Sequence, residues 1–305
     1  MNLKNIAIAF TIFQIFITNQ ILSASSSSQK PLVATSTFSL YDITKHIGMD
    51  RVDAYMILPV GVDIHGYEPT PKEMIKLYKS DLVIYSGAGL EPWIKNFEFK
   101  KRAINMSSYV KLMKSKEDDE EHGHHDYHGS QMDPHYWQDL QNMIKATQQI
   151  TKELTMLSPQ NREFYAKNRD SYVEMLKKLE SDYKSKLKSC KLSTIIVNHN
   201  AFSYLSSNYG FSVKALNGLS TESEPNAKDM AILIEFIKKH KQKTIFFENF
   251  TSDKVMKSIA KEAKVGVEVL QPLENITADE VAKKLSFEDI MRDNLTKISK
   301  SLECK

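Results

Sequence analysis

Short apolar runs and longer amphipathic stretches alternate along the first part of the chain. The stretches 38–47 and 71–78 repeat apolar residues with the period of a helix, and Thr70 and Pro71 suit the cap and first position of the second one. The apolar runs between them are rich in β-branched residues, as expected for buried strands; they span residues 32–35, 52–58 and 81–85, with a weaker run at 103–106. This alternation predicts a parallel sheet with helices on its faces.

The second half of the chain repeats the pattern without repeating the sequence. Strands are expected at residues 194–197, 212–216, 244–248 and 266–270, and helices begin near Ala201, Asn226, Ser252 and Thr277. We therefore predict an α/β fold with two lobes, each built on a mostly parallel sheet flanked by helices.

A long helical stretch, residues 139–187, joins the two halves and is interrupted once, at Ser158 and Pro159. Beyond the interruption, aromatic and aliphatic residues keep helical spacing, and residues 159–187 would extend roughly 40 Å at about 1.5 Å per residue. The apolar stripe is too short and too aromatic for a coiled coil. We expect a rigid backbone helix in a connecting region, residues 138–188, between lobes at 31–137 and 189–305.

The first residues resemble a secretory signal peptide. One basic residue, Lys4, precedes an apolar stretch at 6–17 and a run of small residues, which predicts a leader at 1–24. A membrane-spanning helix is the alternative, but it needs about 20 apolar residues, and Gln14 and Thr18 interrupt the stretch. No cysteine lies near the cleavage region, so we expect an exported, periplasmic protein without a lipid anchor.

Charge and cysteine content limit the partners and the kinds of metal site that the chain can have. Without the leader, which holds one lysine, the chain has 40 basic and 38 acidic residues, and its lysines are spread along helical faces, so no nucleic-acid partner is expected. The two cysteines, Cys190 and Cys304, would form a disulfide or remain separate thiols, and the sequence leaves both alternatives open. Neither cysteine has a second zinc ligand at short spacing.

Five of the nine histidines lie between His122 and His135, beside a dense run of acidic residues. Neutral imidazole suits a borderline ion such as zinc, and carboxylates neutralise the charge of the ion. The insertion 117–129 is too polar to pack in a core, so we assign it weak, accessory metal sites; its histidines are His122, His124, His125 and His128. The alternative is a solvated polar loop.

Three isolated histidines stand at junctions between expected elements. His65 follows the second strand, His135 precedes the connecting helices, and His199 follows the strand 194–197; Gln271 takes the equivalent place after the last strand. Ligands of open α/β sheets bind beyond the carboxyl ends of the strands, and two facing lobes would bring these loops together. Three imidazoles fill most of a tetrahedral zinc shell and leave a fourth position.

The segments around these histidines resemble one family. In chain order, the matching segments are 61–71 (GVDIHGYEPTP), 133–137 (DPHYW), 197–202 (VNHNAF), 219–225 (LSTESEP), 245–248 (IFFE) and 270–273 (LQPL). The chain resembles the metal-specific substrate-binding proteins of bacterial ABC importers, and most closely the periplasmic zinc-uptake (ZnuA-like) members. The resemblance implies one zinc ion as cargo, held in the cleft between the lobes by His65, His135 and His199. It also implies delivery by a monomer to a membrane permease driven by a cytoplasmic ATPase.

The sequence leaves the choice between zinc and manganese and the identity of the fourth ligand open. Manganese-uptake relatives usually offer a carboxylate where this chain has Gln271, and three imidazoles favour zinc over manganese. Water, Gln271, a mobile histidine or an unidentified carboxylate could complete the shell, with Glu224 and Glu248 as further candidates for the fourth ligand or for contacts to the histidines. An all-histidine site would lose affinity below about pH 6.5, the ordinary pKa of histidine.

Two alternatives belong to other classes. A zinc-dependent hydrolase would also use three histidines and a water, but the chain has no His-Glu-x-x-His spacing and no other hydrolase signature. A surface adhesin or metal-storage protein would be expected to show a cell-wall segment, a lipid anchor or repeats, none of which is recognisable in the sequence.

Overall fold

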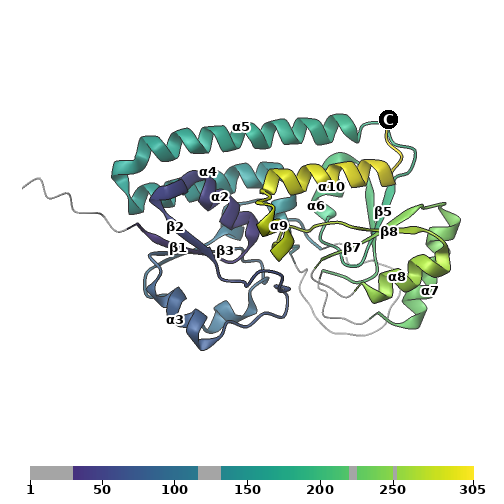
Figure 1. The fold of residues 1–305 in the computed structure, drawn as a ribbon, viewed down its shortest axis with the longest axis horizontal. Helices are drawn as coiled ribbons and strands as arrows, with labels where there is room; N and C mark the ends of the chain where they lie inside the picture. Colours follow the sequence, from purple (N-terminus) through teal and green to yellow (C-terminus); the bar gives the residue numbers. More distant parts are fainter. Residues whose placement is uncertain (1–29, 116–131, 220–224, 250–252) are drawn as a thin grey trace, which may run out of the picture. The chain divides into compact units, whose positions relative to one another are not determined.

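A four-stranded parallel sheet forms the first lobe of the computed structural model (Figure 1). Its central strands are β1 (Leu32–Thr35) and β3 (Leu82–Tyr85), flanked by β2 (Asp53–Met56) and β4 (Arg102–Asn105). The central strands are contiguous apolar runs because helices cover both faces of the sheet. Each strand lies within about one to two residues of its predicted position, the uncertainty inherent in element boundaries.

Alternate residues of the central strands enter two different clusters. Val33 and Ile84 join the main hydrophobic core, together with residues of α2 (Phe38–Gly48). Ala34 and Val83 point to the opposite face, where Leu77 of α3 (Pro71–Lys79) is part of their cluster. As predicted, α3 begins after Thr70, whose side chain accepts a hydrogen bond from the Glu73 backbone in a capping box.

Two pairs of parallel strands form the second lobe. β5 (Thr194–Val197) pairs with β6 (Ser212–Ala215), and β7 (Thr244–Phe247) pairs with β8 (Gly266–Val269). The helices of this part are α6 (Ser203–Tyr209), α7 (Ala227–Lys239), α8 (Lys254–Ala263), α9 (Ala278–Ala282) and α10 (Phe287–Ser301). The predicted α/β fold with parallel strands and flanking helices is confirmed.

The structure describes residues 30–115, 132–219, 225–249 and 253–305. Several predictions therefore lie outside the described residues: the leader at 1–24, the histidine-rich insertion at 117–129, most of the segment 219–225 including Glu224, and the helix start near Ser252. Within the described ranges, no helix has both the length and the apolar character needed to cross a bilayer.

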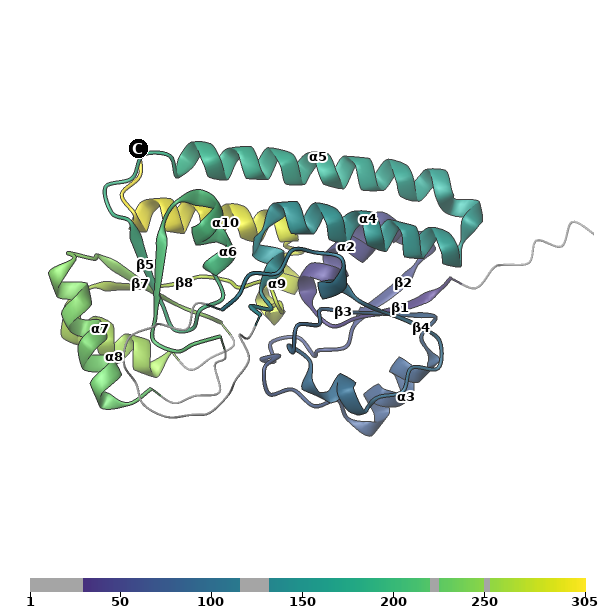
Figure 2. The ribbon, with the colours of Figure 1, turned by 180° about the vertical axis from the view of Figure 1, so that it is seen from behind.

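The connecting region is a pair of packed helices. α4 (Leu140–Leu157) ends at Ser158, a short turn begins at Pro159, and α5 (Arg162–Lys186) follows. α5 contacts α2, α4 and α10, and Figures 1 and 2 show it lying along these helices. Its 25 residues extend roughly 37 Å at about 1.5 Å per residue.

Buried tyrosines anchor α5 to helices of both lobes. The Tyr172 hydroxyl donates to Asp42 of α2 at 2.7 Å, and the Tyr183 hydroxyl donates to the Met291 carbonyl of α10, also at 2.7 Å. Each bond satisfies a polar atom within an apolar interface, where an unpaired hydroxyl would be costly. These contacts account for the aromatic stripe in the sequence and for a rigid backbone helix.

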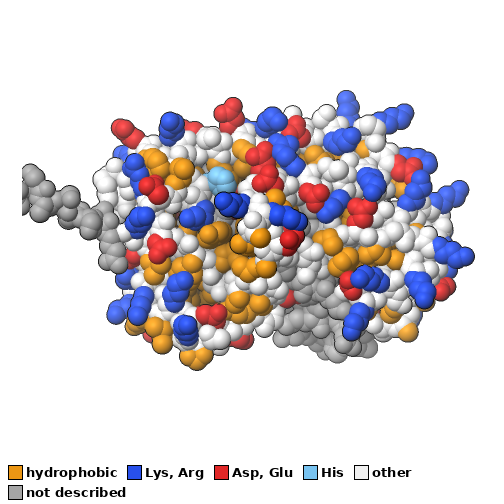
Figure 3. All heavy atoms as spheres, in the orientation of Figure 1, with side chains coloured by type: hydrophobic (Ala, Val, Ile, Leu, Met, Phe, Trp, Pro, Cys, Tyr) orange, Lys and Arg blue, Asp and Glu red, His pale blue; other side chains and the backbone are white. Residues whose placement is uncertain are grey.

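Charged side chains cover the surface without segregating by sign on the face shown in Figure 3. Lysine and arginine side chains there alternate with aspartate and glutamate. Among the described residues, several opposite charges pair one helical turn apart, such as Lys184 with Glu180 and Lys283 with Asp279. This face of the described chain therefore presents mixed charge.

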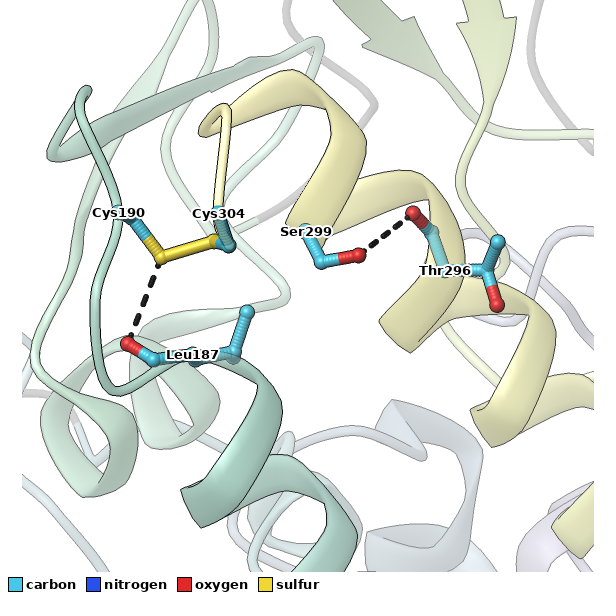
Figure 4. The surroundings of a disulfide bond; sticks show 5 residues. All are labelled: Leu187, Cys190, Thr296, Ser299 and Cys304. Atoms are coloured by element: carbon cyan, nitrogen blue, oxygen red, sulfur yellow. Dashed lines mark hydrogen bonds between the residues drawn. A yellow bond between two sulfur atoms is a disulfide. The ribbon is translucent and has the colours of Figure 1, made fainter.

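A disulfide joins Cys190, which follows α5, to Cys304, which follows α10 (Figure 4). The two segments also pair through their backbones, since Leu192 donates to the Leu302 carbonyl at 2.9 Å and Lys305 donates to the Ser189 carbonyl at 3.0 Å. The sequence left this pairing open, and the structure resolves it. The bridge closes a loop with a sequence separation of 114 residues.

Replacing both cysteines by serine should destabilise the protein without changing its ligand binding. The crosslink restricts the unfolded chain, and for a loop of this length we expect a loss of about 3–5 kcal/mol in the free energy of unfolding. Denaturant unfolding of the oxidised protein and of the Cys190→Ser, Cys304→Ser variant measures this loss. Reducing agent should lower the midpoint of the native protein and leave that of the variant unchanged. Equal midpoints for the oxidised protein and the variant would contradict the assignment of a stabilising role.

Candidate metal centre

Four side chains converge on one point in the interior: His65, His135, His199 and Glu274. One potential ligand atom of each lies within 4.8 Å of the others. The Nε2 atoms of His135 and His199 are 3.4 Å apart, and Glu274 Oε2 lies 3.7 Å from His65 Nε2 and 3.8 Å from His135 Nε2. His135, His199 and Glu274 are fully buried, and the His65 side chain is 8% exposed. The structure thus brings together all three histidines predicted from the sequence.

His65 and His199 lie in loops that follow strands, and His135 lies directly before a short helix. His65 lies in the loop between β2 and α3, where its backbone N–H donates to Asp63 Oδ1 at 3.0 Å. His135 precedes a short turn of helix at Tyr136–Gln138, and its backbone N–H donates to Asp133 Oδ1 at 2.9 Å. His199 follows β5 directly after Asn198. Local turns formed by aspartate side chains therefore fix two of the three backbones.

Carboxylates contact the outer nitrogens of two of the histidine rings. Asp133 Oδ1 lies 2.8 Å from His135 Nδ1, and the carboxyl group of Glu248, which follows β7, is in close contact with His199 Nδ1. A carboxylate at Nδ1 retains the proton there and leaves the Nε2 lone pair directed at the common point. Glu248, one of the sequence candidates, therefore contacts the far side of the His199 ring.

Glu274 is the fourth side chain, and the sequence pattern did not single it out. The candidates that the sequence offers for the fourth ligand are water, Gln271, a mobile histidine or an unidentified carboxylate. The Gln271 amide instead donates to Glu280 at 3.0 and 3.2 Å, and its oxygen accepts from the Leu273 backbone at 3.2 Å. Leu273 has a φ of 68°, and Glu274 follows this left-handed turn. The only signal in the sequence was a carboxylate three residues beyond the expected position.

Burial sets the protonation of the centre. Burial, with smaller contributions from His135 and His199, lowers the pKa of His65 to about 2, and burial also lowers the pKa of His199. Burial raises the pKa of Glu274 to about 7 and holds that of Glu248 well above its ordinary value. The imidazoles of His65 and His199 are therefore neutral near pH 7, which is the form that binds a metal ion.

The donor set fits a zinc ion. Among the buried polar atoms of the described residues, His65 Nε2 and both carboxylate oxygens of Glu274 have no hydrogen-bond partner. Such groups are costly to bury unless a ligand or a cation satisfies them. Three imidazole nitrogens and one carboxylate oxygen suit zinc, and Glu274 is a candidate for the fourth ligand that the sequence left open.

Comparison with known proteins also points to zinc binding. Residues 33–301 match a family described as "Zinc-uptake complex component A periplasmic" (ZnuA). The high-affinity zinc uptake system protein ZnuA of Bacillus subtilis is 34% identical over 290 residues, which cover 93% of this chain and 91% of the relative. The zinc-binding protein AdcA of Streptococcus pyogenes is 30% identical over 310 residues, covering 96% of this chain and 60% of AdcA.

Solved structures show the same fold. A laminin-binding protein (Lmb) of Streptococcus agalactiae, described as a bifunctional protein with adhesin and metal transporting activity, superposes with a TM-score of 0.80 at 28% identity, covering 90% of this chain and 100% of Lmb. The Zn(II)-bound ZnuA-like domain of Streptococcus pneumoniae AdcA superposes with a TM-score of 0.76 at 28% identity, with the same coverage of 90% and 100%.

Proposed function

Because this chain belongs to the ZnuA family of periplasmic zinc-uptake components, we propose that it binds one zinc ion through His65, His135, His199 and Glu274 and delivers it to the permease of an ABC importer. The observation that carries the proposal is the convergence of these four buried side chains within 4.8 Å. Zinc is the cargo here, and the permease with its cytoplasmic ATPase is the expected partner.

The chemistry of capture follows from the protonation of the centre. His65 and His199 offer neutral nitrogens without prior loss of a proton, whereas Glu274 must release the proton that burial favours. The carboxylate of Glu274 then neutralises part of the charge of the ion. Asp133 and Glu248 accept the Nδ1 protons of His135 and His199, which strengthens these nitrogens as ligands.

Metal analysis combined with competition tests this function. Protein purified without chelator should contain one zinc ion per chain, and a chelating dye should remove it only slowly. Manganese should bind more weakly than zinc, because manganese favours oxygen ligands and the centre offers three imidazoles. Tighter binding of manganese would favour the alternative, a manganese-uptake protein. Growth of a zinc-uptake mutant on limiting zinc, restored by this chain, tests delivery.

The other classes of function have separate tests. The family consists of substrate-binding transport proteins, and a zinc hydrolase would need a ligand position open to water and substrate. Turnover of esters or amides by the zinc-loaded protein, abolished in His135→Ala, would establish catalysis. Saturable binding to laminin-coated surfaces would support the adhesin alternative.

We also propose that the protein is exported and acts free in the periplasm as a monomer. The AdcA of Streptococcus pneumoniae is named a lipoprotein, so attachment deserves a direct test in this chain. Mass spectrometry of the mature protein determines the cleavage site and any lipid, and sedimentation determines the number of chains. A lipid-modified N-terminus or a stable dimer would contradict this part of the proposal.

Deleting residues 117–129 should remove only weak zinc sites. Four histidines lie in this insertion, outside the described residues, and we propose that they bind zinc loosely beside the four-residue centre. Equilibrium dialysis at high zinc should show several ions on the intact chain and one on the shortened chain, with the tight affinity unchanged. A full-length variant with His122, His124, His125 and His128 replaced by asparagine controls for chain length. A weakened tight site in both variants would show that the insertion contributes a ligand.

A further inference from the structure

The segment 272–276, which connects β8 to α9, contacts the first lobe although it belongs to the second half of the sequence. The Glu274 carbonyl accepts from the Phe38 backbone, at the start of α2, at 2.8 Å, and the Ile276 carbonyl accepts from the Gly61 backbone at 3.0 Å. Figures 1 and 2 show the chain crossing from β8 to α9 at this point. Glu274 is therefore held by the backbone of the lobe that carries His65.

Asn275 provides the side-chain part of this attachment. Its Nδ2 donates to the carbonyls of Pro59 and Val62, at 2.7 and 2.6 Å, and its Oδ1 accepts from the Ile276 backbone at 2.7 Å. The residue is fully buried. Both N–H groups of one amide thus hold the loop that leads to His65, while the adjacent residue is Glu274.

The loop that Asn275 holds has little regular structure of its own. β2 ends at Met56 and α3 begins at Pro71, and the residues between them form only turns and irregular backbone. The position of His65 in such a segment depends on a few specific bonds, because ordering a loop costs conformational entropy. Two of those bonds come from Asn275.

The same segment also contacts the loop of His135. The Pro272 carbonyl accepts from Trp137 Nε1 and from Gln138 Nε2, each at 2.7 Å, and both donors are fully buried. His199 is held differently: Asn200 next to it donates to the Gly218 carbonyl at 2.9 Å, within the second lobe. Segment 272–276 therefore connects three of the four side chains of the centre.

We propose that Asn275 is a positioning residue for zinc capture and holds His65 and Glu274 in a fixed position relative to each other. These two side chains and His135 then form a preformed three-ligand subsite, and His199 completes the site. This inference rests on the proposed zinc-binding function. A preformed subsite binds faster and more tightly, because the ordering of the His65 loop precedes the arrival of the ion.

Two substitutions at Asn275 test the proposal directly. Asn275→Ala removes both donors, and Asn275→Asp keeps the shape but turns an oxygen toward two carbonyl oxygens. Zinc affinity, measured with zinc and a competing dye, should fall about 10- to 100-fold in each, mainly through slower association. Asn142→Ala is the matched control, because Asn142 is equally buried and forms two bonds with the Lys111 backbone, at 2.8 and 2.9 Å. It should lower the unfolding midpoint and leave zinc affinity unchanged.

A double-mutant cycle separates positioning from general stability. In a His199→Ala background, which retains the subsite, Asn275→Ala should reduce the residual zinc affinity by the same factor as in the native protein. In a His65→Ala background it should have a much smaller effect, because part of its role is to position His65. Native affinity in Asn275→Ala, or an equal loss in all backgrounds and in Asn142→Ala, would overturn the inference. Failure of the native protein to bind zinc would instead overturn the proposed function.

Discussion

Zinc affinity should fall by at least about a hundredfold when His135 or His199 is replaced by alanine. Losing a contact outside the metal shell already costs roughly 10- to 100-fold, and each of these substitutions removes a ligand as well. A hundredfold loss corresponds to about 2.8 kcal/mol of binding free energy. Competition titration of the purified variants against a chelating dye measures the change.

The partner carboxylates add a loss of stability to this loss of affinity. His135→Ala leaves Asp133 Oδ1 without its ring contact at 2.8 Å, and His199→Ala does the same to Glu248, in a region where both carboxylates are buried. A buried carboxyl group that loses one of its contacts is destabilised in both the free and the loaded protein. We therefore expect lower unfolding midpoints in addition to weaker binding.

His240→Ala is the matched control for these variants. His240 follows α7, is exposed, and its Nδ1 lies 2.9 Å from the Phe236 carbonyl. Its loss should leave zinc affinity within a factor of two or so of the native value, the range of ordinary surface substitutions. Native affinity in His199→Ala would show that the assigned centre is not the tight site.

The strands β1, β3, β5 and β7 were predictable because they are largely apolar, β-branched or aromatic runs bounded by polar loops. β1 and β5 have the predicted limits, Leu32–Thr35 and Thr194–Val197. The histidines were predictable from the same frame, because loops at the carboxyl ends of parallel strands gather at one edge. The junction positions of His65 and His199 follow from this frame, and the resemblance to the zinc-uptake family implied the full set with His135.

Features that depend on contacts distant in sequence were not predictable. The pairing of Cys190 with Cys304 and the attachment of segment 272–276 to the first lobe join residues far apart in the chain. The lobe limits predicted at 31–137 and 189–305 place Glu274 in the second lobe, whereas its backbone is bonded to Phe38. Those limits remain a proposal, and this segment is the place to revise them.

Glu274 was missed because local geometry, rather than residue order, places it in the centre. The position after the last strand belongs to Gln271, which the resemblance marked as the candidate. A left-handed Leu273 then redirects the chain, and such a conformation in a leucine is not signalled by the sequence. The sequence left the fourth ligand open between water, Gln271, a mobile histidine and an unidentified carboxylate. Glu274 is such a carboxylate, and this weakens part of the sequence argument against manganese.

The pH dependence of zinc binding should change accordingly and should depend on Glu274. Burial raises the pKa of this carboxyl to about 7, so below pH 7 zinc must displace a proton from it. Affinity should fall up to about tenfold for each pH unit below 7, as expected for competition with one proton. The His65 pKa near 2 removes this ring from competition in that window, and the lowered pKa of His199 weakens the competition of protons for that ring.

Glu274→Gln should reveal the origin of this dependence. The amide has nearly the same shape but no proton to lose, so affinity at pH 8 should fall about 10- to 100-fold while the slope between pH 5.5 and 7 becomes shallow. Glu91→Gln is the control, since burial raises the pKa of that carboxyl to about 6 and it accepts bonds from the Ser86 and Gly87 backbones outside the centre. It should keep the native slope. An unchanged slope in Glu274→Gln, with the loss instead centred near pH 6.5, would assign the competing proton to a histidine, as an all-histidine site requires.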